Sequence, residues 1–143
     1  MTLLVLDTNV VLDMLVFEDP LVQPLLAALT AGEVTACADE STLTELRLVL
    51  AYPSFALDEA ARHAIQARYL ELVRVAPEEQ ALPPPPLPRC RDRDDQKFLV
   101  LAARVGASWL VSKDKRVLSM AGRSGLSFSI LTVRQAVERL RPG

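Results

Sequence analysis

The sequence predicts an α/β fold: a three-layer α/β/α sandwich with a mainly parallel central sheet. Apolar runs of strand length alternate with longer stretches of helical periodicity, which is the order of repeated β–α units. The first apolar run, residues 3–6, is continuous rather than alternating, as expected for a parallel strand that is buried on both faces. A chain of 143 residues supports one core, so we expect a single domain over residues 1–143.

The first strand ends at a charged residue, Asp7. We assign residues 3–6 and 10–12 to this buried strand and expect a short helix or turn at residues 13–15. A carboxylate at the carboxyl end of a buried strand lies where open α/β sheets bind their ligands. Its burial is costly unless a positive group compensates for the charge. Asp7 is therefore the first candidate site residue.

Helices and strands alternate over the rest of the chain. An amphipathic stretch after Pro20 ends at Gly32, as a helix with a glycine C-cap does. Thr132 and Gln135 fit a capping box that opens the last helix. The further strands are expected at residues 34–38, 73–76, 109–112 and 127–131. The further helices are expected at residues 41–51, 57–73, 95–105, 115–120 and 132–140.

A proline-rich stretch at residues 82–88 separates two parts of the chain. It holds five of the ten prolines and favours an extended polyproline conformation over a helix or a central strand. We expect a stiff surface connection within one domain. Recognition of the stretch by a proline-binding module is the alternative.

The two parts of the chain carry opposite charge. Residues 1–88 have a net charge of −9 and residues 89–143 one of +7, which together give −2 for the whole chain. This asymmetry favours a polyanionic partner for the basic part. An equally good alternative is that acidic and basic side chains are interspersed on the folded surface, with no such partner.

Composition excludes several classes of protein. No apolar run approaches the roughly 20 residues of a membrane helix, and the N-terminus lacks a secretion signal, so we expect a cytoplasmic protein. Two cysteines and one histidine are too few for a disulfide framework or a zinc site. We expect buried or half-exposed thiols at Cys37 and Cys90 and a surface position for His63.

Three more carboxylates occupy positions that solubility alone does not explain. Glu45 lies on a partly apolar helix face and Asp95 borders the apolar face of a later helix. Asp114 follows the expected strand at residues 109–112. Each also has a local explanation: Glu45 fits a capping box with Thr42, Asp95 suits a helix N-terminus, and Asp114 fits an N-cap.

Taken together, the four carboxylates predict a metal site. The carboxyl ends of parallel strands and the helix starts beside them converge on one crevice, where the carboxylates would repel one another and raise their pKa values. A divalent cation removes this conflict, and oxygen ligands alone favour Mg²⁺ or Mn²⁺. Such a site suits phosphoryl chemistry with a metal-activated water. Nearby basic residues would hold a phosphate backbone: Arg89, Arg91, Arg93, Lys97, Lys113, Lys115 and Arg116.

Four blocks of the sequence, at residues 4–10, 43–46, 90–99 and 110–115, resemble the PIN domain. The likeness is greatest to the subfamily of toxin components of toxin–antitoxin systems, and it runs from the first strand to the final helix. The Asp-Thr-Asn opening is only moderately specific, whereas all four blocks at these spacings form a specific set.

The resemblance implies a metal-dependent ribonuclease in which metal-activated water attacks an RNA phosphodiester in line. It implies that the acidic metal-binding quartet, which is also the catalytic set, is Asp7, Glu45, Asp95 and Asp114. Asn9 and Ser112 fall on polar positions that support the ligands. Asp92 and Asp94 compete with Asp95 on spacing alone; the motif favours Asp95, with Asp92 as an auxiliary. The residues expected on the RNA backbone are Arg91, Arg93, Lys97, Lys113 and Lys115.

The resemblance also implies partners. Members often form homodimers, and toxin members are blocked by an antitoxin whose tail enters the acidic groove. The chain departs from the subfamily pattern outside the quartet: Arg93 stands in place of proline, and Gln96 and Arg116 stand in place of acidic residues. The site is thereby more positive, which would strengthen backbone binding or alter the choice of antitoxin.

Other readings of the first strand fit less well. A haloacid-dehalogenase-type phosphatase needs a second aspartate two residues after the first, where this chain has Asn9. A phosphoacceptor receiver domain needs an acidic pair near the end of the first strand, and Asp7 has no acidic neighbour. The alternative that remains is a PIN-like module that binds RNA or a protein without turnover.

Overall fold

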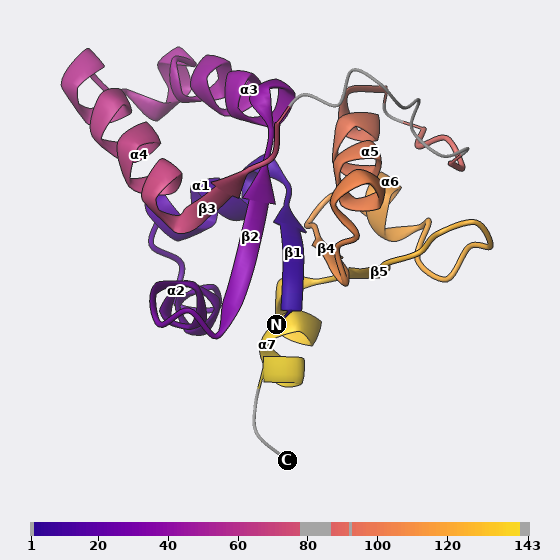
Figure 1. Ribbon diagram of the computed structural model, residues 1–143. Coiled ribbons are helices and arrows are strands. Elements are labelled where there is room, and N and C mark those ends of the chain that lie inside the picture. Colours follow the sequence, from indigo (N-terminus) through magenta and orange to yellow (C-terminus); the bar gives the residue numbers. More distant parts are fainter. Residues whose placement is uncertain (1, 78–86, 92, 141–143) are drawn as a thin grey trace.

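A five-stranded, all-parallel sheet forms the centre of the computed structural model, which describes residues 2–77, 87–91 and 93–140 (Figure 1). The strand order is β3-β2-β1-β4-β5, so β1 lies in the middle. The strands are β1 (Thr2–Leu6), β2 (Val34–Ala38), β3 (Val73–Val75), β4 (Trp109–Val111) and β5 (Ser129–Leu131). This confirms the predicted α/β fold with a parallel sheet.

Helices cover both faces of the sheet. Alternate side chains of β1 point to opposite faces: Leu4 and Leu6 join one core, and Val5 joins the other. The first core is completed by α1 (Thr8–Leu15), α2 (Gln23–Thr30), α3 (Glu40–Leu50), α4 (Glu59–Leu72) and α7 (Val133–Leu140). The second is completed by α5 (Gln96–Val105) and α6 (Lys115–Leu118). Two short 3₁₀ turns, η1 (Pro53–Phe55) and η2 (Arg93–Asp95), precede α4 and α5.

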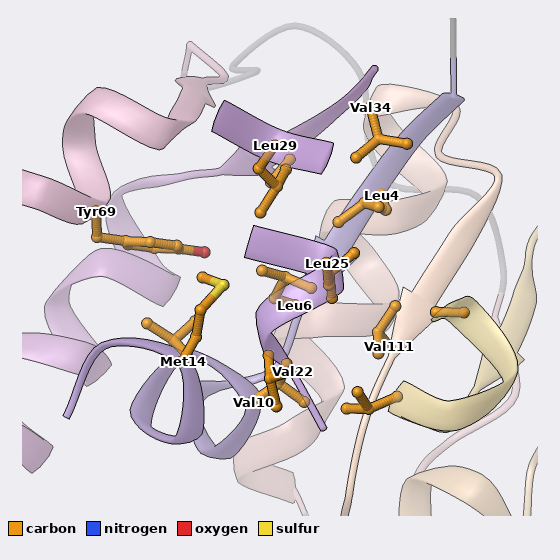
Figure 2. Packing of buried hydrophobic residues seen from close by; sticks show 14 of the residues in the cluster. Leu4, Leu6, Val10, Met14, Val22, Leu25, Leu29, Val34, Tyr69 and Val111 are labelled. Carbon is orange, nitrogen blue, oxygen red and sulfur yellow. The ribbon is translucent and has the colours of Figure 1, made fainter. Parts of the chain in front are cut away.

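The larger core is almost entirely aliphatic and packs directly behind the end of β1. Figure 2 shows Leu4 and Leu6 of the sheet among Val10 and Met14 of α1, with Leu25 of α2 beside them. Burial of each leucine contributes on the order of 1.5–3 kcal/mol. This packing fixes the β1–α1 junction, and with it the position of Asp7.

One predicted boundary is wrong: residues 10–12 belong to helix α1, not to the first strand. A short apolar run does not distinguish a buried strand from a buried helix. The side chain of Asp7 decides the outcome, because it caps α1 by accepting a hydrogen bond from the Val10 amide at 3.0 Å. The chain therefore turns from strand to helix at the carboxylate.

The other expected elements are present with shifts of a few residues at their ends. The capping box of Thr132 and Gln135 is formed in both directions, at 2.9 and 3.1 Å. Both cysteines are buried and His63 is exposed, as expected. Residues 82–86 of the proline-rich stretch lie outside the described residues. Within the described part of the chain, no helix is long and apolar enough to cross a membrane.

Candidate metal centre

Asp7 is a buried carboxylate with three hydrogen-bond donors around it. Its side chain is only 3 % exposed. Oδ1 accepts from the Val10 amide, and Oδ2 accepts from the hydroxyl of Ser112 and from the Lys113 amide at 3.2 Å. The Asp7 amide donates to the carbonyl of Val111 at 3.1 Å. The ends of β1 and β4 are thereby joined at this residue.

Burial dominates the electrostatics of Asp7. Desolvation raises the pKa of its carboxyl above the ordinary value, and this is the largest effect. The hydrogen bonds from Ser112, Val10 and Lys113 lower the pKa, whereas the charge of Asp114 raises it further. Burial also raises the pKa of Tyr69, and the nearby Asp7 charge adds to that shift. A cation at this position would relieve the cost of the ionised form.

Asp114 lies beside Asp7 because Ser112 connects them. The fully buried Ser112 hydroxyl donates to Asp7 and accepts from the Asp114 amide at 3.0 Å. Asp114 also caps α6, with its Oδ1 accepting from the Arg116 amide at 2.7 Å. Asp114 can therefore be both the N-cap of α6 and a site residue, because the cap uses Oδ1 and does not use Oδ2.

Glu45 is not the capping residue that the sequence predicted. The capping box of α3 is made by Asp39 and Thr42, with side-chain to backbone distances of 2.9 and 3.0 Å. The Glu45 carboxylate is turned toward the site instead. Its Oε2 accepts from the hydroxyl of Thr8, and its Oε1 lies 2.7 Å from Nζ of Lys97.

Asp95 is the last residue of η2, immediately before α5. The side chain is partly exposed and its Oδ2 is buried. Helix α5 is held in place by Phe98 and Leu99, which are buried against the sheet. Because Lys97, two residues later, reaches Glu45, the start of α5 lies near the middle of α3.

Hydrogen bonds connect three of the four predicted ligands. Asp7 and Asp114 meet through Ser112, and Glu45 is joined to them through Thr8, the neighbour of Asp7. Among the described residues, no three acidic, histidine or cysteine side chains are close enough together to hold a metal ion as they stand. The donor set nevertheless consists of carboxylate and hydroxyl oxygens, which fit Mg²⁺ or Mn²⁺.

The other two residues predicted to support the ligands are Asn9 and Asp92. Asn9 is exposed at the start of α1, one residue beyond the Thr8 that contacts Glu45. Asp92 lies outside the described residues.

Sequence reasoning missed two contacts at the site. Thr8 contacts Glu45, although the sequence drew attention only to its neighbours. Lys113 forms an ion pair with Asp13, a carboxylate of α1 that is 8 % exposed. The available signal for Asp13 was a single charge within the otherwise apolar run 10–15.

The basic residues predicted to contact RNA fall into two classes. Lys97 is ion-paired with Glu45 of the site, and Lys113 is ion-paired with Asp13 of α1. Arg91, Arg93 and Lys115 are exposed.

A family model described as PIN domain matches residues 3–116. The matched span extends from β1 into α6 and includes Asp7, Glu45, Asp95 and Asp114. No match was found among curated proteins or among solved structures.

Proposed function

The chain belongs to the PIN domain family, and on that premise we propose that it is a Mg²⁺- or Mn²⁺-dependent ribonuclease. PIN domains are typically nucleases and generally use divalent metal ions. The observation that best supports the proposal is the buried Asp7 carboxylate, which Ser112 joins to Asp114 and Thr8 joins to Glu45. Asp7 also caps α1, but the hydrogen bonds that it accepts offset only part of the cost of its burial, which a bound cation would reduce.

The residues of the site would have different roles. Asp7, Asp95, Asp114 and Glu45 would hold the cation. Bound there, a divalent ion would supply a water of lowered pKa and offset charge on the phosphate oxygens. Ser112 holds the Asp7 carboxylate and the backbone amide of Asp114, and Thr8 fixes the rotamer of Glu45.

RNA would be held by exposed basic side chains of the second part of the chain. Arg91 and Arg93 precede Asp95, and Lys115 follows Asp114, so phosphate contacts flank the carboxylates along the sequence. Such contacts are independent of base sequence. We propose single-stranded RNA as the substrate class.

A role as the toxin of a toxin–antitoxin pair is the finer proposal, with a homodimer as its assembly. It rests on the resemblance of the four sequence blocks. Growth arrest on expression of the chain, absent for Asp7→Asn, would support this role. Normal growth on expression of an active nuclease would contradict it.

A binding module without turnover is the second candidate. The ion pair of Lys97 with Glu45 favours it, because one of the four ligands is already neutralised. The two candidates differ in whether RNA is cut.

The test is cleavage of single-stranded RNA by the purified protein with Mg²⁺ or Mn²⁺. We expect slow cleavage that falls by about 100-fold or more in Asp7→Asn, as when one electrostatic group of a catalytic site is removed. No cleavage with either metal, or equal cleavage by Asp7→Asn, would contradict the proposal. Asp94→Asn is the matched control: it should retain metal binding, whereas Asp95→Asn should weaken it.

A further inference from the structure

The outer edge of strand β5 is a candidate binding surface separate from the carboxylate site. Among the described strands β5 pairs only with β4, so its other edge has no neighbouring strand (Figure 1). The Ser129 amide donates to the carbonyl of Ser108 at 2.9 Å. The Leu131 carbonyl accepts from the Ser112 amide, also at 2.9 Å. Because the backbone groups of successive strand residues point to opposite sides, the amide and carbonyl of Ile130 point away from β4.

A pocket of about 370 Å³ lies along this free edge. It is lined by all three residues of β5, by residues 121–123 of the segment after α6, and by Gln135 and Arg139 of α7. The segment after α6 packs on one face of the sheet through Met120, whereas α7 packs on the other face through Ala136. The pocket therefore extends around the sheet edge from one helical layer to the other.

Two arginines from opposite layers make the pocket positively charged. Arg123 comes from the segment after α6, and Arg139 comes from the last turn of α7. Both side chains are exposed, and neither forms an ion pair with any residue in the described part of the chain. No acidic side chain is found among the described residues that line the pocket. This charge favours a ligand that carries negative groups.

The free edge of β5 matches a peptide better than a nucleic acid. An extended peptide beside β5 would accept a hydrogen bond from the Ile130 amide and donate one to the Ile130 carbonyl, as an added strand does. Phosphate oxygens only accept hydrogen bonds. Binding of single-stranded nucleic acid also relies on aromatic side chains on which bases stack, and Phe128, the aromatic residue that lines the pocket, is only 7 % exposed.

The two arginines also specify how the negative charges of such a peptide are spaced. Successive side chains of a strand point to opposite faces, and Arg123 and Arg139 lie in opposite layers. Two adjacent acidic residues would therefore point one toward each arginine. Two acidic residues separated by one position would both point to the same face, where only one arginine lies.

We propose that the free edge of β5 and its pocket form a docking site for an extended segment of a partner protein that carries two adjacent acidic residues. A strand of three residues offers few backbone hydrogen bonds, so Arg123 and Arg139 contribute much of the affinity. None of the described residues that line the pocket belongs to the candidate metal centre. Docking here is therefore independent of the proposed nuclease function.

The test is an NMR titration of the ¹⁵N-labelled full chain with the synthetic peptide Val-Thr-Glu-Glu-Val-Thr, blocked at both ends. We expect saturable binding, with the largest shifts at the Ile130 amide and at residues 121–123. Each exposed arginine–carboxylate pair contributes up to about fivefold in affinity. Val-Thr-Gln-Gln-Val-Thr, which lacks both charges, should bind about 25-fold more weakly, and Val-Glu-Thr-Glu-Val-Thr, whose charges share one face, about fivefold more weakly.

Variants of the protein test the two arginines directly. Arg123→Gln and Arg139→Gln should each weaken binding of the acidic peptide by about fivefold. Arg134→Gln is the matched control, because it removes the same charge from an exposed position of α7 outside the pocket, and it should bind as the wild type does. Thermal unfolding would verify that each variant is folded, and the peptide series on the wild type decides the matter if one is not.

Several outcomes would overturn the docking site. They are shifts located away from the pocket, no saturation up to about 1 mM peptide, equal binding of the three peptides, and equal weakening by Arg134→Gln. Decauridylate RNA is the last probe. If it binds the wild type and is released by the double substitution of Arg123 and Arg139, while the acidic peptide does not bind, the pocket belongs to a nucleic acid instead.

Discussion

Asp7 is a carboxylate placed where the fold disfavours its charge. Burial at 3 % exposure raises its pKa, and three hydrogen bonds offset only part of that effect. Natural cores keep such a group when it has a use that packing does not supply. In this protein the use we propose is cation binding, because the nearby Asp114 would otherwise add to the cost.

The raised pKa of Asp7 predicts a pH-dependent stability. A carboxyl whose folded pKa exceeds its unfolded value, 3.8, binds more protons in the folded state. Its contribution to stability is therefore complete below the unfolded pKa and is lost as pH rises through the folded pKa. Without metal, we expect the wild type to lose stability relative to Asp7→Asn as pH rises above the unfolded value of 3.8, by at most about 1.4 kcal/mol per pH unit.

Urea unfolding of both proteins in EDTA across this range measures the difference. The other carboxylates are common to both chains and cancel. A difference that stays constant, or that moves in favour of the wild type with rising pH, would contradict the assigned shift.

The proximity of site residues could be predicted where they follow neighbouring strands, but not where they lie on helices. Asp7, Ser112 and Asp114 follow neighbouring parallel strands, whose ends must meet, so their proximity was predictable. The contact of Lys97 with Glu45 was not, because it joins residues 52 positions apart on helices of opposite layers. No local pattern encodes where two such helices meet.

At the scale of elements, the capping box of α3 determines how Glu45 is presented. Asp39 and Thr42 satisfy the first turn of the helix, and the glutamate one turn later is free to reach Thr8 and Lys97. The sequence fits a box of Thr42 with Glu45 equally well. Only the three-dimensional position of Asp39 at the end of β2 distinguishes the two.

Removal of this cap should destabilise the fold. We expect Asp39→Ala to lower the free energy of unfolding by about 1 kcal/mol, within the usual range of about 0.5–2 for a lost N-cap. Ser41→Ala is the matched control, since Ser41 is exposed in the same turn and should change stability by less than about 0.5 kcal/mol. Urea unfolding measures both, and equal effects of the two substitutions would refute the observed box.

Helix α1 illustrates a limit of sequence patterns for short elements. Residues 10–12 are β-branched or apolar, and by propensity they favour a strand. The Asp7 cap and the burial of Val10, Val11 and Leu12 against the sheet outweigh that preference. The same residue thus ends the strand, starts the helix and contributes a site carboxylate.

At the scale of the whole molecule, the fold class was predictable because it depends on the alternation of elements rather than on their exact ends. The five parallel strands place β1 in the middle, with β2 and β4 beside it. Because β1 is central, Asp7 at its end lies where the two helical layers meet. The candidate site therefore includes residues from both parts of the chain, the acidic residues 1–88 and the basic residues 89–143.

Metal binding should stabilise the whole molecule, because a cation that binds the assembled carboxylates does not bind the unfolded chain comparably. At a Mn²⁺ concentration about 100 times the dissociation constant, we expect a gain of about 2.7 kcal/mol in the free energy of unfolding. At a fixed Mn²⁺ concentration the gain should grow with rising pH, opposite to the trend without metal, since the ion binds the ionised carboxylates more tightly. Asp7→Asn should show little gain.

The control for this prediction is KCl at the same ionic strength, which screens surface charges but does not coordinate carboxylates. An equal gain with KCl would assign the effect to screening. An equal gain in the wild type and Asp7→Asn would place the bound ion elsewhere on the acidic part of the chain. A gain confined to the wild type and increasing with pH would tie the stability of the sheet to the carboxylate at the end of its central strand, because Asp7, which caps α1 and joins β1 to β4, would then also hold the cation.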